Sequence, residues 1–175
     1  MTVRELTVLR SGLLTTVQDL GRWGHQAAGV PVAGAMDTYS LRLANALVGN
    51  ASTAAVLEVT LAGPTLRAEG SVVVATAGAV FELWLDDRLV PHGAAIEVPA
   101  GAVVRFGERR QATRAYLAVA GGFDTPPVLG SRSTHLISGM GGVSGRALAA
   151  GDVLPVGMSS PAPSGRATHA RPASS

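Results

Sequence analysis

The side chains best suited to chemistry lie in a glycine-rich stretch, TVQDLGRWGHQAAGVPVAGAMD, which runs from residue 16 to residue 37. Gln18, Asp19, Arg22 and His25 alternate there with closely spaced glycines, so a backbone with little side-chain bulk presents several hydrogen-bonding groups. This pattern is typical of a loop that faces a ligand. The alternative is a long surface turn whose polar side chains only satisfy neighbouring backbone groups.

A second polar segment, LGSRST, places Arg132, Ser133 and Thr134 in succession. A planar guanidinium beside two hydroxyls is suited to a carboxylate or phosphate oxygen. Alternatively, Arg132 pairs with a core carboxylate such as Glu58 while the hydroxyls cap a turn. The nearby run SGMGGVSGR does not follow a strand and open a helix as a dinucleotide-binding loop does, so it is interpreted as a turn.

One segment has the pattern of a helix. Asp37 is a favourable N-cap residue, and the apolar residues after it recur at helical spacing until Gly49 and Asn50, which tolerate a left-handed C-cap. Asp37, Ser40 and Asn45 lie beside the apolar stripe and could face the glycine-rich loop. In the alternative, Asp37 only caps the helix and Asn45 only satisfies neighbouring backbone groups.

The remaining chain predicts short strands. Apolar residues make up 47% of the sequence, only 4% is aromatic, and turn residues recur about every eight to twelve positions from residue 65 onward. Glu58 lies inside an apolar run, where it either faces solvent or pairs with an arginine. Asp86-Asp87 and Pro99-Ala100-Gly101 resemble hairpin turns. Strands are expected at 2–9, 13–17, 56–61, 72–76, 80–85, 95–98, 103–106, 114–120 and 153–156. The prediction is a mainly β fold with one main helix.

Composition excludes several kinds of chemistry. All 14 basic residues are arginine, so this chain cannot form a lysine Schiff base and has neither a P-loop lysine nor a lysine that could be biotinylated. Without cysteine there are no disulfides or thiolates, and the four histidines are too far apart in sequence to suggest a metal site. A net charge of +2 gives little support for nucleic-acid binding. No signal segment or bilayer-length apolar run occurs, so a soluble cytoplasmic protein, not bound to a membrane, is expected.

The domain boundary is expected near residue 157. Residues 1–157 carry the apolar and turn patterns of one domain, whereas residues 158–175 are rich in Ser, Pro, Ala and Arg and have no apolar periodicity. This tail is expected to be disordered.

Seven motifs follow one another in order along the chain. They are T-x-V-Q-D-x-G-R-x-G at 15–24, G-A-M-D-x-x-S at 34–40, A-N-x-L-V-G-N at 44–50, L-E-V-T-x-x-G-P at 57–64, R-A-Y-L-A-V-A-G-G at 114–122, L-G-S-R-S-T at 129–134 and G-R-x-L-x-x-G-D at 145–152. With these motifs the sequence resembles the allophanate hydrolase subunit 2 family, also called the biotin-dependent carboxyltransferase family or the 5-oxoprolinase C subunit.

The resemblance implies a cyclophilin-like β-barrel and a working unit of several polypeptides. The partners implied are a subunit 1-type homologue and a further 5-oxoprolinase subunit, with ATP as a cofactor of the complex and a small amide as substrate. Family members carry a second barrel-like half. Without it, the apolar strands at 72–76 and 115–120 are expected to leave surface facing water, so that the isolated chain self-associates or requires its partner and is inactive alone.

The first functional hypothesis is a subunit of an ATP-dependent amidohydrolase that converts 5-oxoproline to glutamate. Arginines would hold an oxyanion, a phosphate or the substrate carboxylate, and aspartates would orient a water or an amide N–H. The expected catalytic residues are Asp19, Arg22, Asp37 and Arg132, and the expected substrate-binding residues are Gln18, Asn45, Ser133 and Thr134. The alternatives are a non-catalytic module that regulates a subunit 1-type partner, and the carboxyltransferase component of a biotin-dependent urea carboxylase-like system.

Overall fold

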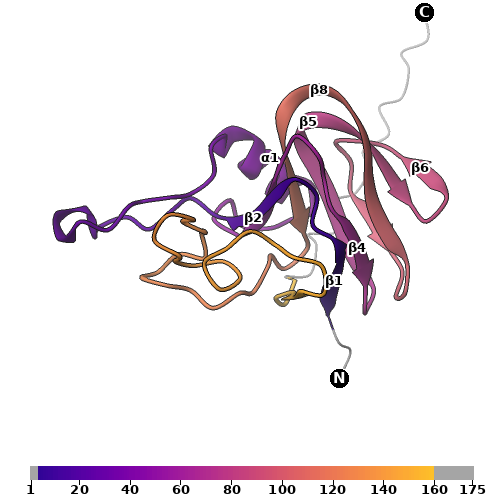
Figure 1. The fold of residues 1–175 in the computed structure, drawn as a ribbon. Coiled ribbons are helices and arrows are strands. Elements are labelled where there is room, and N and C mark those ends of the chain that lie inside the picture. Colours follow the sequence, from indigo (N-terminus) through magenta and orange to yellow (C-terminus); the bar gives the residue numbers. More distant parts are fainter. Residues whose placement is uncertain (1–3, 160–175) are drawn as a thin grey trace, which may run out of the picture.

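A computed structural model describes residues 4–159 (Figure 1). It contains one α-helix, a short 3₁₀ helix and a nine-stranded sheet. The helices are α1 (Thr38–Leu47) and η1 (Gln26–Ala28). The strands are β1 (Glu5–Arg10), β2 (Leu14–Gln18), β3 (Val56–Thr60), β4 (Thr65–Ala68), β5 (Val72–Leu85), β6 (Arg88–Val90), β7 (Ile96–Val98), β8 (Val103–Val119) and β9 (Val153–Pro155).

Two long strands organise the sheet. β5 and β8 pair antiparallel along most of their length, from Val74 opposite Val119 to Leu85 opposite Val104. The first part of β8 also pairs with β4 and its last part with β3, so the strand order is β2-β3-β8-β4-β1-β9. Because β8 changes neighbours along its length, the sheet curls into a half-barrel (Figure 1). The prediction of a mainly β, barrel-like fold with one main helix is confirmed.

Several strand boundaries were predicted wrongly. The strands expected at 72–76 and 80–85 form one strand. Gly78, at φ +84°, allows the register between β5 and β8 to shift there without ending β5. The strands expected at 103–106 and 114–120 also join, since pairing with β5 extends into the polar segment between them. β4 and β6 were not predicted.

One predicted hairpin turn is present and the other is not. Asp86 and Asp87 connect β5 to β6, which pair as a hairpin. Residues 99–101 also form a turn, but the strand before it, β7, pairs with β5 and not with the strand that follows.

The core fills both sides of the central strands. Leu6, Leu57, Leu66, Leu117 and Leu154 are among its fully buried side chains. On the other face of the sheet, α1 packs through a second cluster of buried residues: Leu41, Ala44, Val56, Ala77, Tyr116 and Ala118.

The apolar runs at 72–76 and 115–120 are covered within this chain. Their side chains are buried, apart from the partly buried Val73. The expectation that these strands leave a water-facing apolar surface is therefore wrong. The predicted tail overlaps the described residues only at Met158 and Ser159, and the rest of it lies outside them. Neither helix in residues 4–159 has the length and apolar character needed to cross a bilayer.

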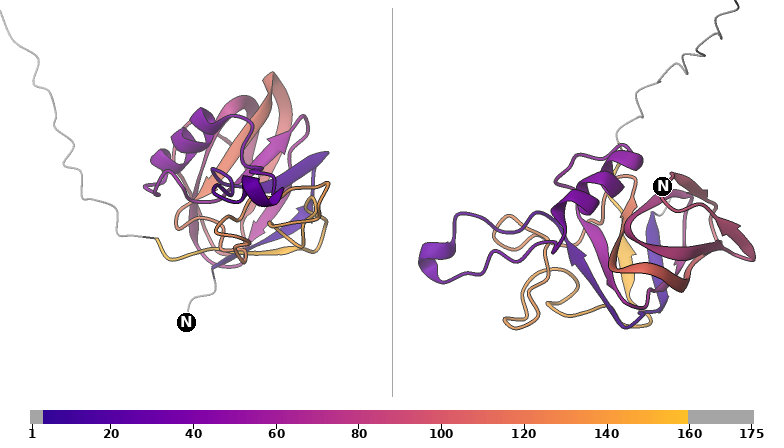
Figure 2. Two further views of the ribbon diagram at one scale, coloured as in Figure 1. Left: turned by 90° about the vertical axis from the view of Figure 1, so that its left-hand side faces the viewer. Right: turned by 90° about the horizontal axis from the view of Figure 1, so that it is seen from above.

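The glycine-rich loop of residues 21–35, here called the arm, projects from the half-barrel (Figures 1 and 2). The loops between β8 and β9 lie on the same side of the sheet and run alongside the base of the arm (Figure 2). The two polar segments of the sequence are thus brought to the same edge of the fold.

Candidate functional site

The two polar segments are held together where the arm leaves β2. The backbone N–H of Asp19 donates to Ser133 Oγ at 2.9 Å, and the N–H of Thr134 donates to the carbonyl of Val17 at 2.9 Å. Ser133 and Thr134 are buried. The contact is therefore an internal joint between β2 and the β8–β9 loops.

Asp19 is the centre of this joint. Its Oδ1 accepts from Gly21 N at 2.8 Å and from the hydroxyls of Ser131 and Ser133, both at 2.6 Å, while Oδ2 accepts from Arg132 N at 2.7 Å. A carboxylate has about four acceptor positions, so these donors use its capacity. Asp19 is 8% exposed. The geometry makes it a positioning group and leaves little capacity for proton abstraction.

Arg22 is a buried cation without a counter-charge among residues 4–159. Its side chain is 1% exposed, Nε donates to Val128 O at 3.3 Å, and Nη2 donates to Ser133 O at 2.5 Å. No carboxylate of the described residues comes within 4 Å, and Nη1 has no hydrogen-bond partner there. Burial of an uncompensated charge is costly, so this guanidinium favours a nearby anion.

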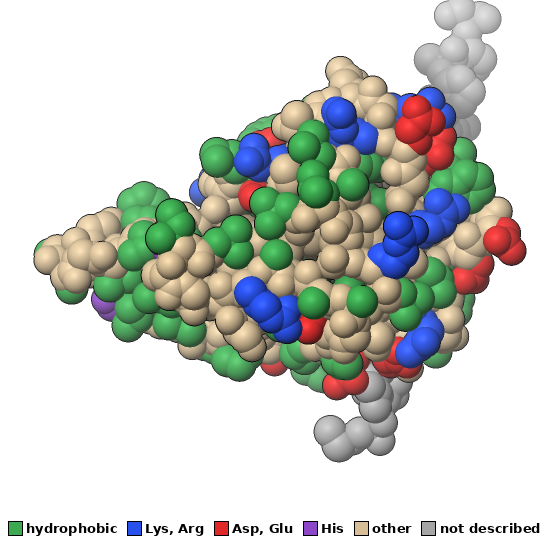
Figure 3. Space-filling view, in the orientation of Figure 1, with side chains coloured by type: hydrophobic (Ala, Val, Ile, Leu, Met, Phe, Trp, Pro, Cys, Tyr) green, Lys and Arg blue, Asp and Glu red, His purple; other side chains and the backbone are tan. Residues whose placement is uncertain are grey.

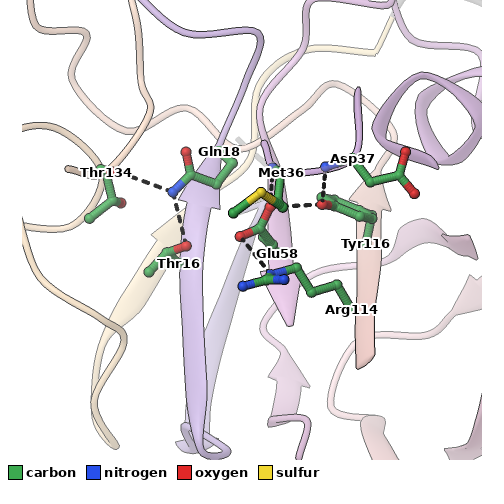
Figure 4. A network of polar contacts seen from close by, with 8 residues as sticks. All are labelled: Thr16, Gln18, Met36, Asp37, Glu58, Arg114, Tyr116 and Thr134. Atoms are coloured by element: carbon green, nitrogen blue, oxygen red, sulfur yellow. Dashed lines mark hydrogen bonds and ion pairs between the residues drawn. The ribbon is translucent and has the colours of Figure 1, made fainter. Parts of the chain in front are cut away.

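Gln18 also has unused hydrogen-bonding capacity. Its Nε2 donates to Thr16 Oγ1 at 3.0 Å and to the carbonyl of Thr134 at 3.1 Å, whereas Oε1 has no partner among the described residues (Figure 4). The carboxylate of Asp19 and the hydroxyls of Ser133 and Thr134 are engaged within the joint. Gln18 and Arg22 therefore each keep a buried polar atom without a partner among the described residues, and so does Arg132 at its Nε.

Arg132 contributes to the joint through its backbone only. Its guanidinium turns outward, and Nη2 lies 2.6 Å from Asp124 Oδ1. It does not pair with Glu58, the alternative that its sequence context had suggested. Arg22 and Arg132 thus differ in environment, since one guanidinium is enclosed and the other forms a surface ion pair.

Asp37 and Asn45 belong to the framework of α1. Asp37 is the N-cap, and its carboxylate accepts from Ser40 N at 3.0 Å and from Ser40 Oγ at 2.5 Å. The Ser40 hydroxyl, followed by the Ser40 N–H, lowers the pKa of Asp37. Asn45 is fully buried, donates to Ala54 O and accepts from Asn50. Neither side chain has a hydrogen bond to the joint among the described residues.

The capping role of Asp37 gives a first testable prediction. Asp37→Ala should lower the free energy of unfolding at neutral pH by about 1 kcal/mol, whereas Asp37→Asn should largely preserve it. Because folding depresses the pKa of Asp37, its ionic contribution is present above the ordinary value of 3.8 and is lost as the pH falls through the lower folded value. Urea unfolding of both variants at pH 7 and pH 3 measures this. Asp87→Ala, in an exposed turn, is the control, and an equal effect there would contradict the capping role.

A polar cluster that the sequence did not predict lies next to the joint (Figure 4). Glu58 Oε2 accepts from Tyr116 Oη and from Met36 N, both at 2.8 Å, and Tyr116 Oη accepts from Asp37 N at 2.8 Å. Arg114 Nε lies 3.8 Å from Glu58 Oε1, so the expected arginine partner of Glu58 exists but is distant. Burial, and then the hydrogen bond to Glu58, raises the pKa of Tyr116.

Strand register explains why this cluster escaped prediction. Glu58 lies opposite both Thr16 on β2 and Tyr116 on β8. The three residues share one row across the sheet, although 100 positions separate the first from the last. No spacing in the sequence reveals such a register.

A hollow of about 610 Å³ opens beside Asp19, Gly21 and Trp23, with Thr38 and Arg42 of α1 on its other wall. Arg42 was not predicted as a site residue. Arginines are distributed over the face in Figure 3 and do not form one basic patch. Within residues 4–159, no group of three or more His, Asp or Glu side chains could hold a metal ion.

Comparison with known proteins identifies the fold and the family. Residues 28–175 match the carboxyltransferase domain, subdomain A and B. The chain is 46% identical over 154 residues to the 5-oxoprolinase C subunit of Escherichia coli, a match that covers 88% of this chain and 50% of that protein. It is 43% identical over 148 residues to urea amidolyase of Lachancea kluyveri, covering 84% of this chain and 8% of the other.

Structural similarity agrees with these sequence matches. The crystal structure of the K. lactis urea amidolyase superposes with a TM-score of 0.86 at 42% identity, over 93% of this chain and 10% of that one. The chain spans about half the length of the 5-oxoprolinase C subunit that it matches. The protein belongs to the carboxyltransferase domain family, subdomain A and B.

Proposed function

We propose that this chain is a component of a multi-subunit enzyme of the 5-oxoprolinase type, which opens the cyclic amide of 5-oxoproline to glutamate. The observation that carries the proposal is the 46% identity to the 5-oxoprolinase C subunit, a protein of which the chain represents half. The urea amidolyase relative, by contrast, contains the matching region as only 8% of its length.

The chemistry of the joint fits an amide substrate. Hydrolysis of an unstrained amide requires stabilisation of negative charge on the amide oxygen and orientation of the attacking group. Arg22 offers a buried positive charge and Gln18 offers a free carbonyl oxygen that can accept from an amide N–H. In this proposal both bind substrate, and Asp19 with the 131–134 backbone holds them in position.

The described residues lack two common phosphate-binding features, a P-loop lysine and a free helix N-terminus. There is no lysine in the sequence, and the N-terminus of α1 is occupied by the carboxylate of its own cap, Asp37. Phosphate groups bind where helix N-terminal N–H groups are free, which is not the arrangement here. We therefore assign nucleotide binding to another subunit of the complex and derive no step through it.

The base of the arm offers a surface for a partner subunit. Trp23 lies in the arm, Met36 directly follows it and Tyr39 is in the first turn of α1, and these side chains are 67%, 71% and 75% exposed. Exposed apolar side chains that gather in one region are typical of interaction sites. This surface, and not the central strands, is where a subunit 1-type homologue would bind.

Reconstitution tests the proposal. The chain, co-expressed with a subunit 1-type homologue and the further 5-oxoprolinase subunit, should release glutamate from 5-oxoproline only when ATP is present. Arg22→Met should abolish most of this activity, and the exposed Arg88→Met should retain it. A complex that assembles without any 5-oxoproline-dependent turnover would contradict the enzymatic proposal and favour a regulatory module.

The second candidate is the carboxyltransferase component of a biotin-dependent system. It is favoured by the 0.86 TM-score to urea amidolyase. Since these 175 residues contain no lysine, the biotinyl carrier would lie outside them. Carboxylation of urea that depends on such a carrier, without 5-oxoproline turnover, would establish this function in place of the first.

A further inference from the structure

A second cavity, of about 660 Å³, opens among the loops between β8 and β9. Its wall consists of residues 138–145 together with Thr125, Val128, Val153 and Pro155, among others. It shares no lining residue with the hollow beside Asp19. Its volume lies within the range of about 300–1,000 Å³ that is typical of small-molecule sites.

The glycine-rich run, interpreted from sequence as a simple turn, forms most of this wall. Gly142 N donates to Arg132 O at 2.9 Å and Gly145 N donates to Gly141 O at 2.7 Å, so the loop folds against the joint and upon itself. Gly141 has φ +73°, and a Cβ there would lie 2.1 Å from Ser133 O and 2.7 Å from Arg22 Nη2. Glycine at this position lets the wall close directly over the guanidinium.

Arg22 therefore lies immediately behind the cavity. Its Nε binds the carbonyl of Val128, and its Nη2 abuts Gly141; both of these residues line the cavity. No Asp, Glu, Arg or His belongs to the lining. A positive charge behind an uncharged wall of low polarizability acts on the cavity with little screening, so the cavity favours an anion.

Thr125 also belongs to the wall and carries a buried hydroxyl. Thr125 is 2% exposed, lines the cavity, and its Oγ1 has no hydrogen-bond partner among residues 4–159. A buried hydroxyl without a partner is rare, because leaving it unsatisfied costs free energy. Val128, Met140 and Val143 add apolar surface to the same wall.

We propose that this cavity binds a small monocarboxylate, with the Thr125 hydroxyl donating to the carboxylate, Arg22 supplying the compensating charge, and the apolar wall contacting the rest of the ligand. One positive charge balances a monoanion, whereas a phosphate dianion would remain uncompensated. The proposal draws on the same Arg22 that the proposed function assigns to substrate, but its test measures binding to this chain alone and so can fail independently of the 5-oxoprolinase assignment.

Calorimetric titration of the isolated chain tests the proposal with three probes. Cyclopentanecarboxylate should bind about tenfold or more tightly than its uncharged analogue cyclopentanecarboxamide, the factor expected for one hydrogen bond to a charged group. Inorganic phosphate should neither bind measurably nor compete. Equal binding of the acid and the amide, binding of phosphate at the affinity of the acid, or no binding of any probe would overturn the proposal.

Two substitutions locate the site without disturbing the fold. Thr125→Val keeps the side-chain shape and removes a hydroxyl that has no protein partner among the described residues, so folding should be preserved while affinity for cyclopentanecarboxylate falls about tenfold. Thr113→Val, at an exposed position, is the control and should leave affinity unchanged. Val153→Trp, at a position that is 49% exposed, should block the cavity and abolish binding. Unchanged affinity in both Thr125→Val and Val153→Trp would show that the probe binds elsewhere.

Discussion

Replacing Asp19 by asparagine is expected to lower the free energy of unfolding by about 3 kcal/mol or more. The carboxylate accepts four hydrogen bonds from Gly21, Ser131, Arg132 and Ser133. An asparagine of the same shape would turn its NH₂ group toward donors that need an acceptor. Each hydrogen bond to a charged group contributes about 1.5–3 kcal/mol, and a buried donor left without a partner costs about 1–3 kcal/mol.

Chemical denaturation of the purified chain measures this loss. Asp87→Asn is the matched control, because that carboxylate is exposed in the β5–β6 turn and should change stability by less than about 0.5 kcal/mol. The loss should be accompanied by faster hydrogen exchange at the N–H of Arg132, which donates to Asp19 Oδ2. If Asp19→Asn unfolds at the same denaturant concentration as Asp87→Asn, Asp19 does not hold the joint and a catalytic role regains support.

The pairing of the two polar segments could be predicted, but the distribution of roles within them could not. Two glycine-rich polar segments indicated that Gln18, Asp19, Arg22 and Asp37 would share one site with Arg132, Ser133 and Thr134. Asp37 lies outside the joint, at the cap of α1. Which hydrogen-bonding groups remain without a partner depends on how the loops pack. The Asp19 carboxylate accepts from four donors, while the Arg22 guanidinium donates only to carbonyls. Donor and acceptor counts of this kind require three-dimensional contacts.

The helix was predicted correctly because the residues that start and end it lie next to it in the sequence. Asp37 caps α1 in the structure as its sequence position predicts, and the helix ends at Leu47, before Gly49. The long strands β5 and β8 were predicted as four shorter ones because Gly78 and the polar residues after Phe106 resemble breaks. Pairing between the two strands overrides that local signal, and it arises from contacts between residues far apart in the chain.

The same limit applies to the cluster around Glu58. A carboxylate inside an apolar run indicated a partner, but its strongest partners are the hydroxyl of Tyr116 and the N–H of Met36. Both contacts fix the end of the arm against the sheet, since Met36 and Asp37 connect the arm to α1. The cluster therefore fixes the end of the arm that carries the exposed Trp23.

Removing the Tyr116 hydroxyl should release this attachment. Tyr116→Phe leaves the N–H of Asp37 without its acceptor and removes one donor from Glu58, so the free energy of unfolding should fall by about 1–3 kcal/mol. Tyr39→Phe is the matched control, because Tyr39 is 75% exposed and should be nearly neutral. Equal stabilities of the two variants would show that the hydroxyl does not hold the arm.

A double-mutant cycle and a pH series separate this attachment from simple packing. Tyr116→Phe combined with Glu58→Gln should show a coupling of about 0.5–3 kcal/mol, because the two side chains share a hydrogen bond.

Folding raises the pKa of Tyr116 above its ordinary value of 10.0, so the folded chain holds the phenol proton more tightly than the unfolded chain. That contribution is complete below pH 10 and is lost as the pH rises further, through the folded pKa. The wild-type chain should therefore lose stability above pH 10 more steeply than Tyr116→Phe, and parallel alkaline curves with no coupling to Glu58 would reduce Tyr116 to a packing residue.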